Sequence, residues 1–234
     1  MDGSRIGMGC KADFAGNSRL GKKANAADRP SPADRTPQEG LFSASPVQFT
    51  LDRMYRSPIK HCKNCGNAVV YRVPDDGDVK ERAVCPACST IHYENPLNVV
   101  GTVPHWGDRV LLCKRNIEPR WGKWTLPAGF MELNETTAQG AARETDEEAG
   151  AQFEMEPLFS MLNVERVGQV HLFYRARLLS DQFRPGHETI EARLFTEAEI
   201  PWEEIAFKTV KTTLECYFAD RRKGSYGIHV LDIS

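Results

Sequence analysis

Acidic residues are concentrated in one short segment of the chain, and this segment constrains the fold more than any other feature. Within 129–150, six acidic side chains accompany a single basic one, Arg143. Glu144, Glu147 and Glu148 follow at spacings that place all three on one face of an α-helix. Like charges at these spacings destabilise an isolated helix by about 0.2–0.5 kcal/mol per pair, which disfavours a simple solvated surface. The pattern indicates a helix that gathers carboxylates around a common cation.

The ends of this helix are marked by local signals. Thr136, followed three residues later by Gln139, matches a capping box, and Gly150 is a typical C-terminal stop. These signals predict a helix over 137–149. Hard carboxylate oxygens without a nearby His or Cys favour Mg²⁺, or Mn²⁺, over zinc as the bound ion.

The segments around this helix alternate between strand and helix patterns. Runs rich in β-branched and aromatic residues predict strands at 98–103, 109–114, 159–164, 170–178 and 192–195. Apolar residues at helical spacing predict a final helix at 207–223. Strands arranged around helices predict an α/β fold, a sandwich with a mixed sheet.

The cysteines form a second pattern. Four of the seven lie in two C-x2-C pairs: Cys62, Cys65, Cys85 and Cys88. Four thiolates close a tetrahedral shell and leave no open position for catalysis, which favours a structural Zn²⁺ ribbon. A redox dithiol and a nucleic-acid-binding finger remain alternatives, although the basic residues of this segment are interleaved with acidic ones. Cys10, Cys113 and Cys216 are interpreted as a tail thiol and two packed residues.

The composition excludes several classes of protein. The net charge of −2 provides no bulk attraction for nucleic acid or anionic lipid. No apolar run is long enough to cross a bilayer and the first residues lack the apolar stretch of a secretory signal, so we expect a cytoplasmic protein. Residues 1–50 have the composition of a disordered tail. A transit peptide, or a true start at Met54, is an alternative reading of the same residues.

The acidic segment resembles the Nudix box, G-x5-E-x7-R-E-U-x-E-E-x-G-U, in which U is aliphatic. Its seven fixed residues are present: Gly129, Glu135, Arg143, Glu144, Glu147, Glu148 and Gly150. The departures are Thr145, where the family prefers a larger aliphatic residue, and Ala151, which is small for its position. Both departures affect packing under the helix and leave the acidic residues in place.

The resemblance implies a Nudix-type α/β/α sandwich and hydrolysis of a nucleoside diphosphate derivative by attack of water on a pyrophosphate phosphorus. It implies metal binding by Glu144, Glu147 and Glu148, with Glu144 also a candidate base, and by the Gly129 carbonyl. Arg143 would hold the glutamates in place. Glu135 is its expected partner.

Family members often draw another carboxylate from a later loop, and here Glu188 is the first candidate and Glu191 the second. A solvated loop acid is the alternative for each of them. Four aromatic residues are candidates to stack on a substrate ring, although each also suits the core: Trp121, Trp124, Phe130 and Phe173.

A zinc ribbon directly before a Nudix domain is found in NADH pyrophosphatases and in a group similar to the plant chloroplast FAD and ADP-ribose pyrophosphatase. Residues 157–169 lack the S-Q-P-W-P-F-P-x-S motif of the former, whereas 110–117 and 124–129 look more like the latter. We therefore expect FAD or ADP-ribose as the substrate, with AMP as a product. NADH hydrolysis, or a nucleotide-sensing or nucleic-acid-binding protein that uses the ribbon, is the alternative.

Together these observations predict a disordered tail at 1–50, a zinc ribbon at 59–96 and a Nudix domain at 97–225. The expected partners are a small nucleotide-diphosphate substrate and no nucleic acid or membrane. Zinc-ribbon relatives also suggest a homodimer.

Overall fold

A computed structural model describes residues 57–234 of the protein. The expectations for 1–50, for Cys10 and for a start at Met54 lie outside these residues. The strands are β1 (Val70–Arg72), β2 (Arg82–Val84), β3 (Ile91–His92), β4 (Leu97–Trp106), β5 (Arg109–Arg115), β6 (Trp124–Thr125), β7 (Ala128–Phe130), β8 (Phe153–Val164), β9 (Gln169–Leu178), β10 (Thr189–Phe195) and β11 (His229–Asp232). The α-helices are α1 (Thr137–Ala149) and α2 (Lys208–Lys223). Short 3-10 turns follow at Glu165–Val167, Glu197–Glu199 and Trp202–Glu204.

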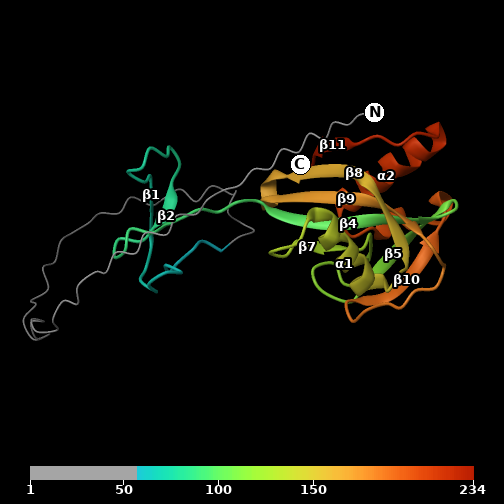
Figure 1. Ribbon diagram of the computed structural model, residues 1–234, viewed down its shortest axis with the longest axis horizontal. Coiled ribbons are helices and arrows are strands. Elements are labelled where there is room, and N and C mark those ends of the chain that lie inside the picture. The colour runs from blue at the N-terminus through green and yellow to red at the C-terminus, as the bar shows by residue number, and fades with distance from the viewer. Residues whose placement is uncertain (1–56) are drawn as a thin grey trace, which may run out of the picture. The chain divides into compact units, whose positions relative to one another are not determined.

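The larger sheet has eight strands and is mixed (Figure 1). Its main path runs β10-β5-β4-β9-β8-β11, with β6 paired to β5 and β7 paired to β4. The β4–β9 and β8–β11 pairs are parallel, and the other pairs are antiparallel. A mixed sheet of this kind agrees with the predicted α/β fold.

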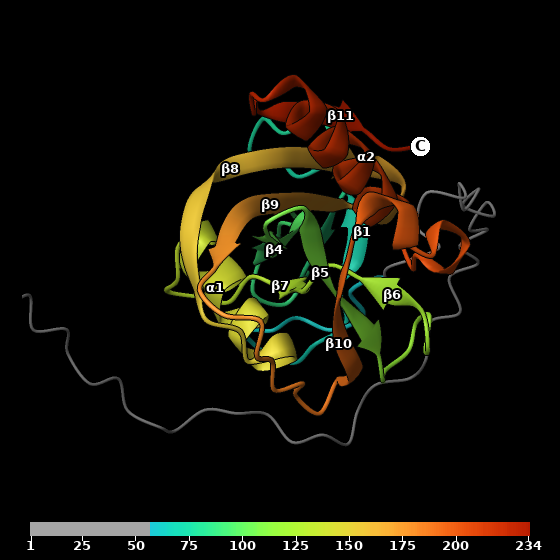
Figure 2. The same ribbon diagram turned by 90° about the vertical axis from the view of Figure 1, so that its right-hand side faces the viewer.

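The two long helices pack on opposite faces of this sheet (Figure 2). Alternate residues of β4 point to opposite faces, so Thr102 faces α1 and bonds Thr145, whereas Val103 joins the core that contains Leu214 of α2. The core beneath α2 is built from fully buried aromatic and aliphatic side chains, among them Phe159 and Phe173. This arrangement is the α/β/α sandwich expected from the sequence.

Helix α1 begins and ends where the local signals predict. The Thr136 side chain accepts from the Gln139 N–H, the Gln139 side chain accepts from the Thr136 N–H, and Gly150 adopts the left-handed conformation. The departure at Thr145 also has a physical explanation. Its hydroxyl donates to the Ala141 carbonyl at 2.7 Å and accepts from the Thr102 hydroxyl at 2.7 Å, so the polar group is satisfied inside the core.

Several predicted boundaries were wrong. The strand predicted at 159–164 begins at Phe153, and the strand predicted from residue 192 begins at Thr189. Three short strands were missed: β6, β7 and β11. Strands of two to four residues are too short to show an alternating pattern, because their pairing is imposed by neighbouring strands.

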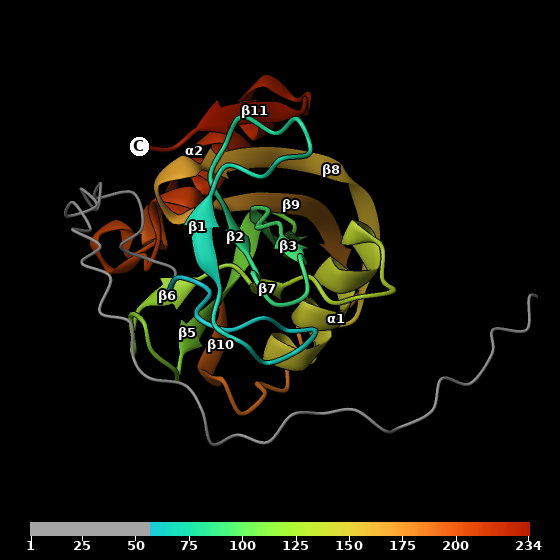
Figure 3. The same cartoon turned by 90° about the vertical axis from the view of Figure 1, so that its left-hand side faces the viewer.

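Residues before Pro96 form a separate three-stranded antiparallel sheet of β1, β2 and β3 (Figure 3). Apart from Cys62 and Cys85, its buried residues are few: Pro74, Ala83, Val84 and His92. Such a small apolar interior cannot by itself stabilise a unit of this size, so a cross-linking metal is physically expected here. No helix within 57–234 combines the length and apolarity that a bilayer span requires.

Candidate functional site

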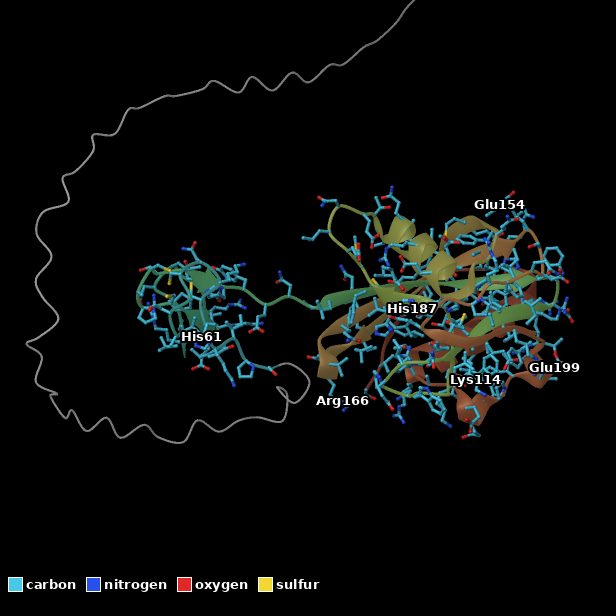
Figure 4. The ribbon with its side chains drawn as sticks, turned by 90° about the horizontal axis from the view of Figure 1, so that it is seen from below. His61, Lys114, Glu154, Arg166, His187 and Glu199 are labelled. Atoms are coloured by element: carbon cyan, nitrogen blue, oxygen red, sulfur yellow. The ribbon has the colours of Figure 1, made fainter. Side chains whose placement is uncertain are left out.

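The acidic side chains line a cavity of about 900 Å³. Strands β4, β5, β7 and β9, helix α1 and the start of α2 all contribute to its walls. The loop before β10 adds His187 and Glu188, and Figure 4 shows the labelled His187 beneath α1. Of the predicted site residues, Gly129, Glu144, Glu147, Glu148, Arg143 and Glu188 all line this cavity. The fold therefore brings together residues from three separate segments of the chain.

Glu148 is the most deeply buried of these carboxylates, with 7% of the residue exposed. Its Oε2 accepts a hydrogen bond from the Ala128 N–H at 3.3 Å. Burial, followed by the neighbouring charge of Glu144, raises the pKa of Glu148 to about 8. No basic side chain within 57–234 forms an ion pair with it. A buried carboxylate of this kind is poorly stabilised unless a cation approaches it.

Arg143 organises the other acidic residues of α1. Its guanidinium donates to both oxygens of Glu135, at 2.9 and 3.1 Å, which agrees with the pairing that the resemblance implied. Its Nη1 also donates to Glu144 at 2.7 Å and to Glu147 at 3.2 Å. Burial raises the pKa of Glu144, while Arg143 opposes that shift. Glu147 is the least enclosed of the set, with 58% of its side chain exposed.

Strand β7 is held against α1 by the same side chains. Glu148 accepts from the Ala128 N–H, and Arg143 donates to the Phe130 carbonyl at 3.2 Å. Gly129 lies between these two contacts, and a Cβ placed on it would lie 2.4 Å from the Glu144 carboxylate. Glycine at this position therefore lets the Glu144 carboxylate approach the backbone closely, and a larger residue would make that flexible side chain move.

We expect Gly129→Ala to displace the Glu144 carboxylate and to weaken divalent-cation binding by about tenfold or more, because the added methyl occupies its position. Isothermal titration with Mn²⁺ measures this effect. Gly227→Ala is the matched control, since a Cβ there meets nothing within 4 Å. Equal cation affinity in both variants would contradict the expected displacement.

The donor set suits a hard divalent cation. The cavity is lined by carboxylate side chains and by no cysteine, and the charges of Glu144 and Glu188 both contribute to the raised pKa of Glu148. The carboxylate oxygens of the cavity do not form a compact ligand cluster in this structure. Within 57–234, only the four cysteines have ligand atoms all within 4.8 Å of one another. Arg143 lies between Glu144 and Glu147.

The structure separates the remaining candidates. Glu188 lines the cavity. Glu191 is exposed within β10, where it lies opposite Lys114 in the strand register with β5. Phe130 lines the cavity and is 54% exposed. Trp124 and Phe173 belong to the core, and Trp121 is exposed outside the cavity. Phe130 is therefore the one aromatic candidate of the four that can meet a ligand here.

Other cavity residues carried no signal in the sequence. Arg115, Phe207 and Thr209 line one part of the cavity, and His171 and Val99 line another. Burial lowers the pKa of His171 to about 4, so its ring is neutral, and its Nε2–H donates to Gln169 Oε1 at 3.0 Å. These residues come from strand and helix ends with no shared motif, so only the tertiary structure reveals their proximity.

The four cysteines of the two C-x2-C pairs converge. The Cys62 and Cys88 sulfurs lie 3.6 Å apart, and those of Cys65 and Cys85 lie 3.5 Å apart. Hydrogen bonds from Thr90 lower the pKa of Cys88 to about 6, whereas burial raises the pKa of Cys85 to about 11. A coordinated Zn²⁺ would stabilise the thiolate form of both. Gly66 and Ser89, which follow the two pairs, both have positive φ, as the tight turns around a metal require.

Comparisons with protein families agree with both halves of this description. Residues 60–94 match the family described as Nudix N-terminal, a zinc ribbon, and residues 96–213 match the NUDIX domain family. Among solved structures, a NUDIX hydrolase from Nitrosomonas europaea is 47% identical, with a TM-score of 0.70. The match covers 75% of this chain and all of the other.

Curated relatives are more distant. A protein of Photobacterium profundum named NAD-capped RNA hydrolase NudC is 28% identical over 70% of this chain. A mitochondrial mouse protein named NAD(P)H pyrophosphatase NUDT13 is 27% identical over 65% of this chain. The chain spans 59% of the length of the first relative and 40% of the second.

Proposed function

This chain belongs to the Nudix family, and from that premise we propose that it catalyses the Mg²⁺-dependent hydrolysis of the pyrophosphate bond of a nucleoside diphosphate derivative. The observation that carries the proposal is the buried Glu148, which forms no ion pair with a basic residue of the described part of the chain and lies near the charges of Glu144 and Glu188 in a cavity of about 900 Å³. A bound divalent cation would stabilise the ionised form of this carboxylate and would supply positive charge for the oxygens of a pyrophosphate.

We assign metal binding to Glu144, Glu147 and Glu148, together with the Gly129 carbonyl. A bound Mg²⁺ would offset the charge of the phosphate oxygens and stabilise the charge that accumulates during the reaction. Arg143 positions Glu144 and Glu147 through its direct ion pairs, and Glu135 fixes the guanidinium from the other side. The ion pairs with Arg143 hold these three carboxylates in defined positions before substrate enters.

The reaction itself is a hydrolysis. The oxygen of water forms a bond to one phosphorus, the bridging P–O bond breaks, and the products are two phosphate monoesters. A carboxylate at the cavity accepts the proton of the attacking water, and Glu144 and Glu188 are our candidates for that base. Burial raises the pKa of Glu144, which brings it closer to the range in which a general base is effective.

We propose FAD or ADP-ribose as the substrate, which would yield AMP, in keeping with the resemblance of 110–117 and 124–129 to the plant chloroplast group. The exposed ring of Phe130 at the cavity is suited to stacking on a flavin or an adenine. NAD(P)H is the second candidate, because the names of the two curated relatives refer to NAD-containing substrates.

A substrate panel tests the proposal. The protein is incubated with FAD, ADP-ribose, NADH and 8-oxo-dGTP in Mg²⁺, and the release of AMP or pyrophosphate is measured by chromatography. We expect AMP from FAD or ADP-ribose, and no release in excess EDTA. Release of AMP from NADH alone would replace FAD or ADP-ribose by NADH as the substrate. Binding of a nucleotide without hydrolysis would favour a nucleotide-sensing protein over an enzyme.

For the ribbon we propose a structural Zn²⁺ held by Cys62, Cys65, Cys85 and Cys88. The convergence of four sulfur atoms within 4.8 Å supports this assignment. Asn64 and Thr90 donate to sulfur atoms of the cluster, which is the kind of support that orients thiolate ligands.

A further inference from the structure

Arg115 is a buried cation that forms no ion pair with any described residue. It lies at the end of β5, with 9% of the residue exposed, and it lines the cavity. Its Nε donates to the Pro119 carbonyl at 2.9 Å, and its guanidinium lies 5.1 Å from the centre of the Phe207 ring. Within 57–234 no carboxylate oxygen lies within the 4.0 Å ion-pair distance of Arg115, whereas Arg143 pairs with three carboxylates.

Thr209 supplies a second unsatisfied group at the same part of the cavity. The residue is 4% exposed, and its buried hydroxyl oxygen has no hydrogen-bond partner among the residues that the structure describes. Buried hydroxyls in folded proteins are almost always hydrogen-bonded, so an exception at a cavity wall calls for a partner that the folded chain does not supply. Thr209 lies in the first turn of α2, a helix of 16 residues.

The N-terminus of α2 strengthens this environment. The residue that precedes the helix, Phe207, is apolar, and no side-chain hydrogen bond caps the helix. The first N–H groups of a helix lack intrahelical partners and attract anions. Backbone contacts hold this turn near Arg115, because the Ala206 N–H donates to the Trp124 carbonyl at 2.8 Å and β6 pairs with β5.

We propose that Arg115, Thr209 and the first turn of α2 form a phosphate-binding subsite that holds the monophosphate of the nucleotide product. The guanidinium provides a planar pair of donors suited to phosphate, and the ring of Phe207 orients it. The Thr209 hydroxyl, which is closed to solvent in this structure, donates a further bond after its side chain rotates toward the phosphate. The subsite shares its cavity with the carboxylates to which metal binding is assigned above.

The charges around the subsite support this division of roles. Arg115 is near enough to Glu148 for its positive charge to lower the pKa of that carboxyl, which partly opposes the larger increase caused by burial. The two groups nevertheless form no ion pair. Glu118 also lines the cavity. A phosphate that enters between the acidic wall and Arg115 pairs the guanidinium without displacing the metal-binding carboxylates. The identity of the bound phosphate as part of a nucleotide rests on the proposed function. The location of the subsite rests on Arg115 and Thr209 themselves.

Binding of AMP and of adenosine tests the subsite without any need for turnover. Isothermal titration is done on the full chain in EDTA and again in Mg²⁺, with inorganic phosphate as a further probe. We expect AMP to bind at least about tenfold more tightly than adenosine. Arg115→Gln should weaken AMP binding by about 10- to 100-fold and leave adenosine unchanged. Thr209→Val should weaken it about threefold to tenfold, and Arg115→Lys should restore part of the loss.

Two control variants complete the experiment. Lys211→Gln removes one positive charge from α2 outside the cavity, and Thr212→Val removes a hydroxyl from the same helix. Both should bind AMP as the unchanged protein does, and thermal melting verifies that every variant is folded. Equal binding of AMP and adenosine, or an Arg115→Gln variant that matches Lys211→Gln, would overturn the subsite. If AMP binding depends on Arg115 but no nucleotide is hydrolysed, the subsite stands and the proposed function falls.

Discussion

Replacing Glu148 by glutamine is expected to lower kcat by about 100-fold or more and, in the absence of a divalent cation, to stabilise the folded protein at pH 8. The loss of activity follows because the amide cannot hold a divalent cation as a carboxylate does. The gain in stability follows because burial raises the pKa of Glu148 to about 8, so its ionised form is disfavoured in the folded state. The glutamine carbonyl can still accept from the Ala128 N–H.

The sign of the pH dependence follows from the same shift. With a folded-state pKa raised above the ordinary value of 4.5, Glu148 contributes its full stability below pH 4.5 and loses it as the pH rises through about 8. At pH 8 in EDTA we expect the glutamine variant to be more stable by on the order of 3 kcal/mol. Mg²⁺ at about 100 times its Kd should raise the free energy of unfolding of the unchanged protein by about 2.7 kcal/mol. It should leave that of the glutamine variant unchanged.

Chemical denaturation at pH 5 and pH 8, with and without Mg²⁺, measures these differences. Glu191→Gln is the matched control, because Glu191 is exposed on β10 and does not line the cavity. It should keep its activity and its response to Mg²⁺. The assignment of Glu148 fails if its glutamine variant is less stable than the unchanged protein at pH 8 in EDTA, or if Mg²⁺ stabilises both equally.

The second large effect is expected in the ribbon. Cys85→Ser should reduce the zinc content from about one ion per chain to nearly none, because a serine hydroxyl does not replace a thiolate. Structural zinc sites contribute about 10–16 kcal/mol of apparent binding free energy, and this ribbon has few buried apolar residues to compensate for its loss. We therefore expect residues 60–94 to lose their protection against hydrogen exchange.

Elemental analysis and hydrogen exchange followed by mass spectrometry provide the two measurements. Cys216→Ser is the control, since Cys216 lies in α2 beside the core and outside the cluster. It should keep its zinc and its protection. The structural zinc would be contradicted if the unchanged protein, purified in the presence of zinc, contained no zinc. It would also be contradicted if the Cys85→Ser variant kept both its zinc and its protection against hydrogen exchange.

Local signals were sufficient wherever the interacting groups are close in sequence. Helix α1 begins at Thr137 and ends at Ala149, as predicted, because the capping box and Gly150 act within one turn of the helix ends. The positions of the two C-x2-C pairs likewise indicated a metal cluster, and their sulfur atoms converge. Neither prediction needed information about distant segments.

The distinction between Glu188 and Glu191 did need information about distant segments of the chain. The two residues are three apart, but a register shift between Thr189 and Glu191 interrupts the pairing of β10 with β5. Glu188 remains in the loop that lines the cavity, whereas Glu191 is carried into the exposed part of the strand. A β-bulge of this kind depends on the partner strand, which the local sequence does not contain.

By itself, the amino-acid sequence determined the acidic helix, its boundaries and the paired cysteines, because side chains within one or two turns interact whatever surrounds them. Only the tertiary structure decided that Glu148 is buried, that Arg143 forms ion pairs with three carboxylates and that Arg115 forms an ion pair with no carboxylate of 57–234. The reason is that desolvation and the pairing of charges depend on side chains that reach the same cavity from distant strands and helices.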